Sequence, residues 1–138
     1  MRVVLDTNVV VSGVFFGGVP GRIMAAWSAG HVSLVISPDI LTEYQRVGVE
    51  LGIGYPDRAA AWDPVLALIT MNATIVDAPP LPERVGEDHD DEKFLAAALA
   101  SRTRIVVSGD ADLLSVSGWH GIRVCSPRQF YDEHLAAG

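Results

Sequence analysis

Four acidic residues lie at positions that often carry functional side chains in α/β proteins, after predicted strands and near the starts of predicted helices. Asp6 follows directly on a short apolar run, and Asp110 follows another after Ser108 and Gly109. Glu43 and Asp91 lie in the first two turns of predicted helices. Ligands of parallel α/β sheets bind beyond the carboxyl ends of the strands. We therefore expect these four carboxylates, which come from distant segments, to converge at that edge of the sheet.

Such a cluster needs positive charge nearby. Two like charges about 4 Å apart repel by roughly 4 kcal/mol at an effective dielectric constant near 20. Lys93 is the only lysine, so the available compensation is a metal ion or an arginine. A site of carboxylate oxygens suits a hard divalent cation, Mg²⁺ or Mn²⁺, far better than zinc or copper.

Further oxygen donors lie close to these acids in the sequence. They are Asn8, Ser108, Asp112, Asp88 and Asp90. Each acid also has a purely structural interpretation, because an aspartate before a helix often caps it. One of the three aspartates at positions 88, 90 and 91 is expected only to cap. We favour Asp91 as the ligand, since the apolar residues after it place it beside the buried helix face. For Asp112, a ligand and a loop residue remain equally open.

Short apolar strands alternate with amphipathic helices in the hydrophobic pattern. The strands are expected at Arg2–Leu5, Val32–Ile36, Ala73–Val76, Arg104–Val107 and Ile122–Cys125. Val9–Phe16 is expected to form a short helix or an extended turn. Further helices are expected to begin near Pro20, Pro38, Pro56, Asp91 and Pro127, and glycines at 48, 52 and 54 follow the apolar face of the helix from Pro38. Strands that are apolar throughout indicate a parallel sheet covered on both faces. We predict a three-layer α/β/α sandwich with a mostly parallel sheet of about five strands, forming one domain over residues 1–138.

Composition favours a globular protein and raises one objection. Hydrophobic residues make up 49% of the chain, and no apolar run approaches the ~20 residues of a spanning helix. We expect a cytoplasmic protein without a membrane partner. The lone Cys125 ends an apolar run, which indicates a buried thiol, and it excludes an internal disulfide. The net charge of −7 argues against a nucleic-acid partner unless a cation bridges phosphates to the acidic residues.

Four motifs, in order and at fitting spacing, carry a family resemblance. They are Val3-Val4-Leu5-Asp6-Thr7-Asn8 with Ser12, Ser37-Pro38-x-x-Leu41-x-Glu43, Asp90-Asp91-x-Lys93-Phe94-Leu95-Ala96, and Val107-Ser108-Gly109-Asp110-x-Asp112-Leu113-Leu114. Together they resemble the PIN-domain family, in particular the VapC-like toxins of toxin–antitoxin pairs. The resemblance extends to Ser126-Pro127-x-x-Phe130, so it spans nearly the whole chain.

This resemblance implies a Mg²⁺- or Mn²⁺-dependent ribonuclease. The family's acidic positions fall on Asp6, Glu43, Asp91 and Asp110, and its supporting positions on Asn8 and Ser108, with Asp112 often acidic. Within that interpretation, Asp6, Asp91 and Asp110 hold the metal, and Glu43 orients the attacking water and accepts its proton. The resemblance also implies an RNA substrate, an antitoxin protein that covers the acidic pocket, and a homodimer.

Other functions fit less well. A dehalogenase-like phosphotransferase has a second aspartate two residues after the first, where this chain has Asn8. A dinucleotide-binding module has Gly-x-Gly-x-x-Gly after the first strand, which is missing here. The remaining rival is a catalytically weak PIN fold that binds RNA or a protein without cleavage. The aromatic residues Trp27, Trp62 and Phe94 fit core faces, whereas base stacking requires exposed rings.

Overall fold

A parallel five-stranded sheet forms the centre of the protein. The computed structural model describes residues 1–136. The strands are β1 (Arg2–Leu5), β2 (Ser33–Ile36), β3 (Thr74–Ile75), β4 (Ile105–Val107) and β5 (Arg123–Cys125). They are ordered β3-β2-β1-β4-β5, and every neighbouring pair is parallel. The predicted sheet is confirmed, and the central strand β1 is fully buried over Val3, Val4 and Leu5.

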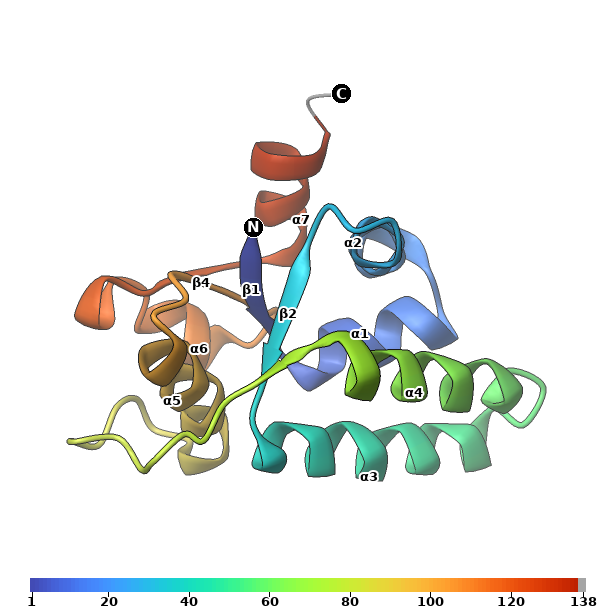
Figure 1. The fold of residues 1–138 in the computed structure, drawn as a ribbon, viewed down its shortest axis with the longest axis horizontal. Helices are drawn as coiled ribbons and strands as arrows, with labels where there is room; N and C mark the ends of the chain where they lie inside the picture. Colours follow the sequence, from blue (N-terminus) through green and yellow to red (C-terminus); the bar gives the residue numbers. More distant parts are fainter. Residues whose placement is uncertain (137–138) are drawn as a thin grey trace.

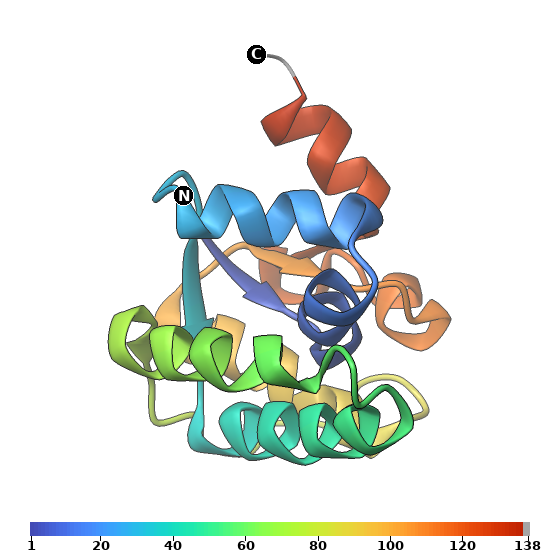
Figure 2. The same ribbon diagram turned by 90° about the vertical axis from the view of Figure 1, so that its right-hand side faces the viewer.

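Helices cover both faces of this sheet, as predicted. They are α1 (Thr7–Phe15), α2 (Gly18–Ser28), α3 (Pro38–Gly54), α4 (Trp62–Asn72), α5 (Glu92–Ser101), α6 (Ala111–Ser115) and α7 (Pro127–Phe130), with 3₁₀ turns η1 (Ala59–Ala61), η2 (His89–Asp91) and η3 (Trp119–Gly121) and a π turn η4 (Tyr131–Leu135). In Figure 1, α5 and α6 lie on one side of β1 and β2, and α1, α2 and α4 lie on the other. Figure 2 shows α3 and α4 side by side beneath α2.

The connectivity explains these layers and locates the crevice. Right-handed crossovers from β1 to β2 to β3 step in one direction, and those to β4 and β5 step in the other. The helices of the two halves therefore cover opposite faces. Strand order reverses at β1, which pairs with both β2 and β4. The crevice where α/β sheets bind ligands thus lies beyond the carboxyl ends of β1 and β4. The arrow of β1 points downward in Figure 1, as does that of its neighbour β2.

Two predicted helix boundaries were wrong, for reasons of tertiary packing. Helix α3 starts as expected, with the Ser37 hydroxyl accepting the Ile40 N–H at 3.3 Å, but it continues unbroken through its glycines. At Gly48 the buried indole of Trp62 occupies the space of a side chain, because a Cβ there would lie 2.1 Å from the ring. The helix predicted from Pro56 begins only at Trp62, after the 3₁₀ turn η1.

Two smaller observations complete the description. Cys125 is fully buried, as its place in an apolar run predicted. Over residues 1–136 no single helix is long and apolar enough to cross a membrane, and α1 and α2 pass that test only as a pair bent by 95°.

Candidate active site

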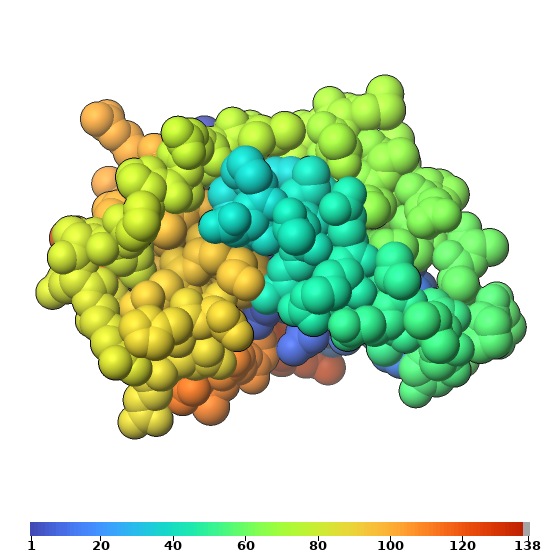
Figure 3. Space-filling view, turned by 90° about the horizontal axis from the view of Figure 1, so that it is seen from below, coloured from blue at the N-terminus to red at the C-terminus, as the bar shows by residue number. Residues whose placement is uncertain are grey.

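The four predicted acids line one cavity at the carboxyl edge of the sheet. Asp6 follows β1, Asp110 follows β4, Glu43 lies on α3, and Asp91 ends the turn η2. Together they line a cavity of about 200 Å³. In Figure 3, which views this edge, blue N-terminal residues lie at the base of a hollow between α3 and the yellow and orange segments. The segments that carry the four acids therefore meet at one place.

Ser108 joins the ends of the two central strands. It is fully buried, and its hydroxyl donates to Asp6 Oδ2 at 2.6 Å. The same hydroxyl accepts the backbone N–H of Asp110 at 3.0 Å. One small side chain thereby fixes the carboxylate after β1 against the backbone after β4. These two hydrogen bonds explain why a serine occupies position 108.

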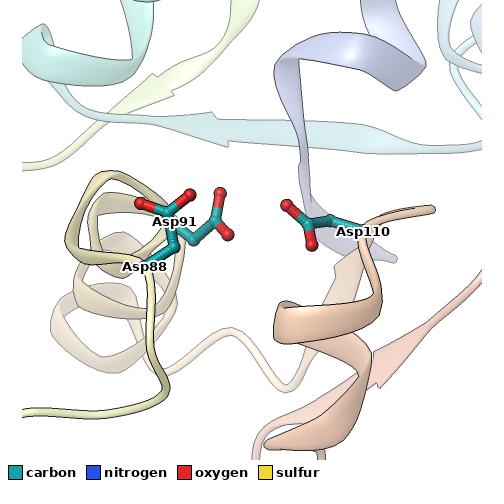
Figure 4. Close-up of side chains that lie close together, drawn as sticks. All are labelled: Asp88, Asp91 and Asp110. Atoms are coloured by element: carbon teal, nitrogen blue, oxygen red, sulfur yellow. The ribbon is translucent and has the colours of Figure 1, made fainter.

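Three carboxylates face one another across the crevice. Oxygens of Asp88, Asp91 and Asp110 lie within 4.8 Å of each other. Figure 4 shows that Asp88 and Asp91 approach from one side and Asp110 from the other. Within residues 1–136, no lysine, arginine or histidine forms an ion pair with any of the three. Their repulsion is therefore not offset by a protein cation in contact with them.

One oxygen of Asp91 is buried without a partner. Its Oδ2 forms no hydrogen bond to any of the described residues. Burial, followed by the neighbouring Asp110 and the charges of Asp88 and Asp6, raises the pKa of Asp91 from 3.8 to about 7. A buried carboxylate oxygen of this kind requires a proton or a cation. The geometry thus favours a bound positive charge at this position.

The neighbouring Asp6 is 5% exposed and is held differently. Burial raises the pKa of its carboxyl, the hydrogen bond from Ser108 and the backbone N–H of Asn8 lower it, and the charges of Glu43 and Asp110 raise it again. The net change is upward. Asp6 borders the cavity but is not a member of the compact trio, in which Asp88 stands instead.

Glu43 is neutralised by the protein itself. The Lys93 ammonium donates to Oε1 at 2.5 Å, and the buried Thr7 hydroxyl donates to Oε2. Arg46 adds a longer contact of 3.9 Å. The sequence predicted a metal ion or an arginine as compensation for the acidic cluster, and the contacts of Lys93 and Thr7 with Glu43 were not predicted. Thr7 follows Asp6 directly and Lys93 lies two residues after Asp91, which was the available signal.

A buried tyrosine supports the same corner. Tyr44 is fully buried, and its hydroxyl donates to the Leu5 carbonyl at 2.5 Å. Burial and the charges of Asp6 and Glu43 raise its pKa far above the ordinary value. The neutral phenol therefore fixes α3 to the end of β1 and holds Glu43 at the cavity.

The remaining oxygen donors are placed unequally. Asn8 and Asp90 are exposed and line the cavity with the four acids. Asp112 lies instead on a small adjoining cavity with Asp88 and Asp91. Its backbone N–H donates to Asp110 Oδ1 at 2.8 Å. Asp88 accepts the Asp90 N–H at 2.9 Å, so it caps η2 and also faces the cluster. The structure thus gives Asp88 both of the roles that sequence analysis had treated as alternatives.

This donor set fits a hard divalent cation. Every candidate ligand is a carboxylate oxygen, and one of these oxygens is buried with no hydrogen-bond donor. Mg²⁺ and Mn²⁺ are bound through one or a few carboxylates together with water and substrate phosphate. Asp91, Asp110 and Asp88, with Asp6 beside them, are the residues that would hold such an ion.

Comparison with known families agrees with this geometry. The family model described as PIN domain matches residues 2–112, a span that contains all four predicted acids. The chain belongs to the PIN domain family. PIN domains are typically metal-dependent nucleases, which is consistent with an oxygen-only acidic site at the switch point of the sheet. No curated protein gave a significant match.

Asp91 of this PIN domain should make stability depend on pH. The folded protein keeps a proton on Asp91 up to about pH 7, whereas the unfolded chain releases it near 3.8. The folded state therefore binds more protons in this window, and stability falls as pH rises. In EDTA, we expect the free energy of unfolding to drop by about 1–2 kcal/mol between pH 5 and 8, with solvent screening allowed for. Urea unfolding at several pH values measures this drop.

Two variants and the addition of Mn²⁺ show whether Asp91 causes this pH dependence. Asp91→Asn should remove most of the pH dependence, whereas Asp63→Asn, on the exposed surface of α4, should retain it. Mn²⁺ competes with the proton, so it should raise the melting temperature more at pH 8 than at pH 5. If the free energy of unfolding of the metal-free protein does not change with pH, the pKa of Asp91 is not raised in the folded state.

Proposed function

We propose that this PIN domain is a divalent-metal-dependent ribonuclease. The observation that carries the proposal is the trio of Asp88, Asp91 and Asp110 beside Asp6. Among residues 1–136 no basic side chain forms an ion pair with the trio, and one of its oxygens is buried without a hydrogen-bond partner. A divalent ion held by these residues would attract the phosphate groups of a nucleic acid. It would thereby answer the objection raised by the net charge of −7, because it would offset the repulsion between the polyanion and the acidic site.

A bound Mg²⁺ or Mn²⁺ supplies Lewis acidity that offsets the charge of the scissile phosphate and favours ionisation of water. Asp91 and Asp110 approach from opposite sides of the crevice and are the principal ligands in this proposal. Asp6, aligned by Ser108, would complete the ligand set. Asp88 lies at the edge of the cavity. In the proposed reaction, water attacks phosphorus and gives a proton to a protein base, and the bond from phosphorus to the 3′ oxygen breaks. The products are a 5′-phosphate and a 3′ hydroxyl, whose oxygen takes its proton from solvent.

Glu43 is the proposed proton acceptor. Lys93 and Thr7 hold one oxygen each, so the carboxylate has a fixed orientation at the cavity. A carboxylate has about four acceptor positions, so two donors leave room for a water. The ammonium of Lys93 fixes the Glu43 carboxylate at the cavity, and we assign Lys93 as a positioning residue.

The direct test is cleavage of a labelled single-stranded RNA by the purified chain. With Mg²⁺ or Mn²⁺ we expect 5′-phosphorylated products, and with EDTA we expect no cleavage. Restoration by added metal after EDTA excludes loss through unfolding. Cleavage in EDTA would refute the mechanism. RNA binding without cleavage at any metal concentration would instead favour a PIN fold that acts as a binding module.

We further propose a cellular setting, which rests on the VapC-like motifs. In it the chain is the toxin of a toxin–antitoxin pair in the cytoplasm, acts as a homodimer, and is silenced by an antitoxin that covers the acidic cavity. Apolar side chains exposed on α4 and β3, such as Leu68 and Ile75, offer surface for contact between copies. A small reading frame beside the gene whose product inhibits cleavage would support the toxin role. Sedimentation analysis tests the dimer.

A further inference from the structure

Two exposed aromatic rings meet at the far end of helices α1 and α3. Phe16 follows α1 and Tyr55 follows α3, with 50% and 41% of their surfaces exposed. Their ring centroids are 5.0 Å apart in an edge-to-face arrangement. Exposed aromatic rings offer faces on which flat ligands can stack. We call Phe16, Tyr55 and the adjoining Arg58 the aromatic platform.

Arg58 gives this platform a positive charge. Its guanidinium carbon lies 5.5 Å from the Phe16 ring centroid and 5.7 Å from that of Tyr55, and one N–H donates to the Phe15 carbonyl at 2.9 Å. Among the described residues, no carboxylate forms an ion pair with Arg58, whereas Arg46, Arg123 and Arg128 are each paired with an acid. A cation on two rings without a carboxylate suits a phosphate group.

Each ring has a glycine beside it in the chain. Gly17 follows Phe16, and Gly54 precedes Tyr55. A Cβ at either glycine would meet no atom within 4 Å. Gly17 has a φ of 78°, which its turn requires, but no left-handed φ explains the glycine at position 54. The backbone beside the rings is therefore uncrowded, and the part of each ring that Arg58 does not cover remains exposed to a flat ligand.

The platform and the acidic cavity lie along the same two helices. Asn8, at the start of α1, lines the cavity, and Phe16 lies eight residues further, about 12 Å along a helix. On α3, Glu43 lines the cavity, and Tyr55 lies about 18 Å beyond it. In Figure 3 blue atoms are visible at the hollow and again in small patches further along α3. A strand of a few nucleotides, stacked at about 3.4 Å each, spans this separation.

We propose that the platform binds unpaired RNA bases a few nucleotides from the scissile phosphate, an inference that rests on the proposed ribonuclease function. A base stacks on Phe16 or Tyr55, and Arg58 contacts the adjoining phosphate. Stacking on exposed aromatics is tolerant of sequence and requires unpaired bases. The substrate class is thus single-stranded RNA or an RNA loop, because a paired base has no free face.

The test measures binding of an unstructured, fluorescent 12-nucleotide RNA by anisotropy with Mg²⁺, on an Asp110→Asn background that prevents cleavage. We expect Phe16→Leu and Tyr55→Leu each to weaken binding about 10-fold. Phe16→Trp should bind as tightly as the parent or more tightly. Arg58→Gln should weaken binding and reduce the slope of log K against log salt by about one. Met71→Ala is the matched control, because Met71 is 79% exposed at the C-terminal end of α4 and does not belong to the aromatic platform.

Abasic substitution in the RNA completes the design. Removing the stacked base should weaken binding to the parent protein but not to Phe16→Leu. Leucine variants that bind RNA like the parent would overturn the proposal. So would leucine variants that change sedimentation and leave RNA affinity intact, because the rings would then be a contact between copies. Platform-dependent binding without any cleavage by the wild-type chain would refute the ribonuclease function and leave the platform standing.

Discussion

Replacing Asp110 with asparagine should lower the rate of RNA cleavage about 1000-fold. Asp110 is the one member of the carboxylate trio that comes from the far side of the crevice, so no other acid of the trio replaces it. Loss of a charged ligand removes several kcal/mol of electrostatic stabilisation, and about 4 kcal/mol corresponds to three orders of magnitude. Asparagine retains an oxygen to accept the Asp112 N–H, so the start of α6 stays intact.

The comparison variant is Asp63→Asn, which makes the same change of charge on the exposed surface of α4. It should cleave at the wild-type rate. Single-turnover rates at saturating RNA and metal separate the chemical step from binding. If Asp110→Asn retains more than a tenth of the wild-type rate, Asp110 is not a principal ligand.

Replacing Gly48 with alanine should destabilise the protein strongly, although the change adds only one methyl group. The added Cβ would lie 2.1 Å from Trp62 Cε2 and 2.2 Å from Nε1. The indole is buried at 2% exposure and packs near Phe15, so it has little room to move. Overpacking of this kind costs about 2–3 kcal/mol, more than alanine gains as a helix former. Urea unfolding measures the difference.

Gly54→Ala tests the same exchange on the same helix without the clash. A Cβ at position 54 would meet nothing within 4 Å, so the variant should match or slightly exceed wild-type stability. Equal stability of the two variants would mean that Trp62 moves freely, and that the unbroken course of α3 does not depend on this contact.

Sequence patterns predicted the fold because it depends on local signals. Fully apolar strands such as Val3–Leu5 identified a parallel sheet, and Ser37-Pro38 located the start of α3. The switch-point rule then placed Asp6 and Asp110 at one edge. The same local signals failed at Gly48, where a residue that ordinarily weakens a helix is required by an indole fourteen positions later. Packing between distant residues decided that element.

Side-chain pairing could not be obtained from sequence. The positions of Glu43 and Lys93 were evident, but their contact depends on how α3 and α5 approach each other at the crevice. The place of Asp88 in the carboxylate trio depends on the path of the loop before η2. The aromatic platform could not be predicted from the sequence for the same reason. Phe16 ends an apolar run, and only the structure shows that its ring faces solvent while Phe15 is buried.

The central claim is that these carboxylates hold a divalent ion, and a crystal structure grown with Mn²⁺ tests it most directly. Data collected at the manganese absorption edge should show one anomalous peak or more in the crevice, about 2.2 Å from carboxylate oxygens of Asp91 and Asp110. The peak should vanish in Asp91→Asn. Saturating Mn²⁺ with no peak among these residues, or with every peak elsewhere on the protein, would contradict the claim.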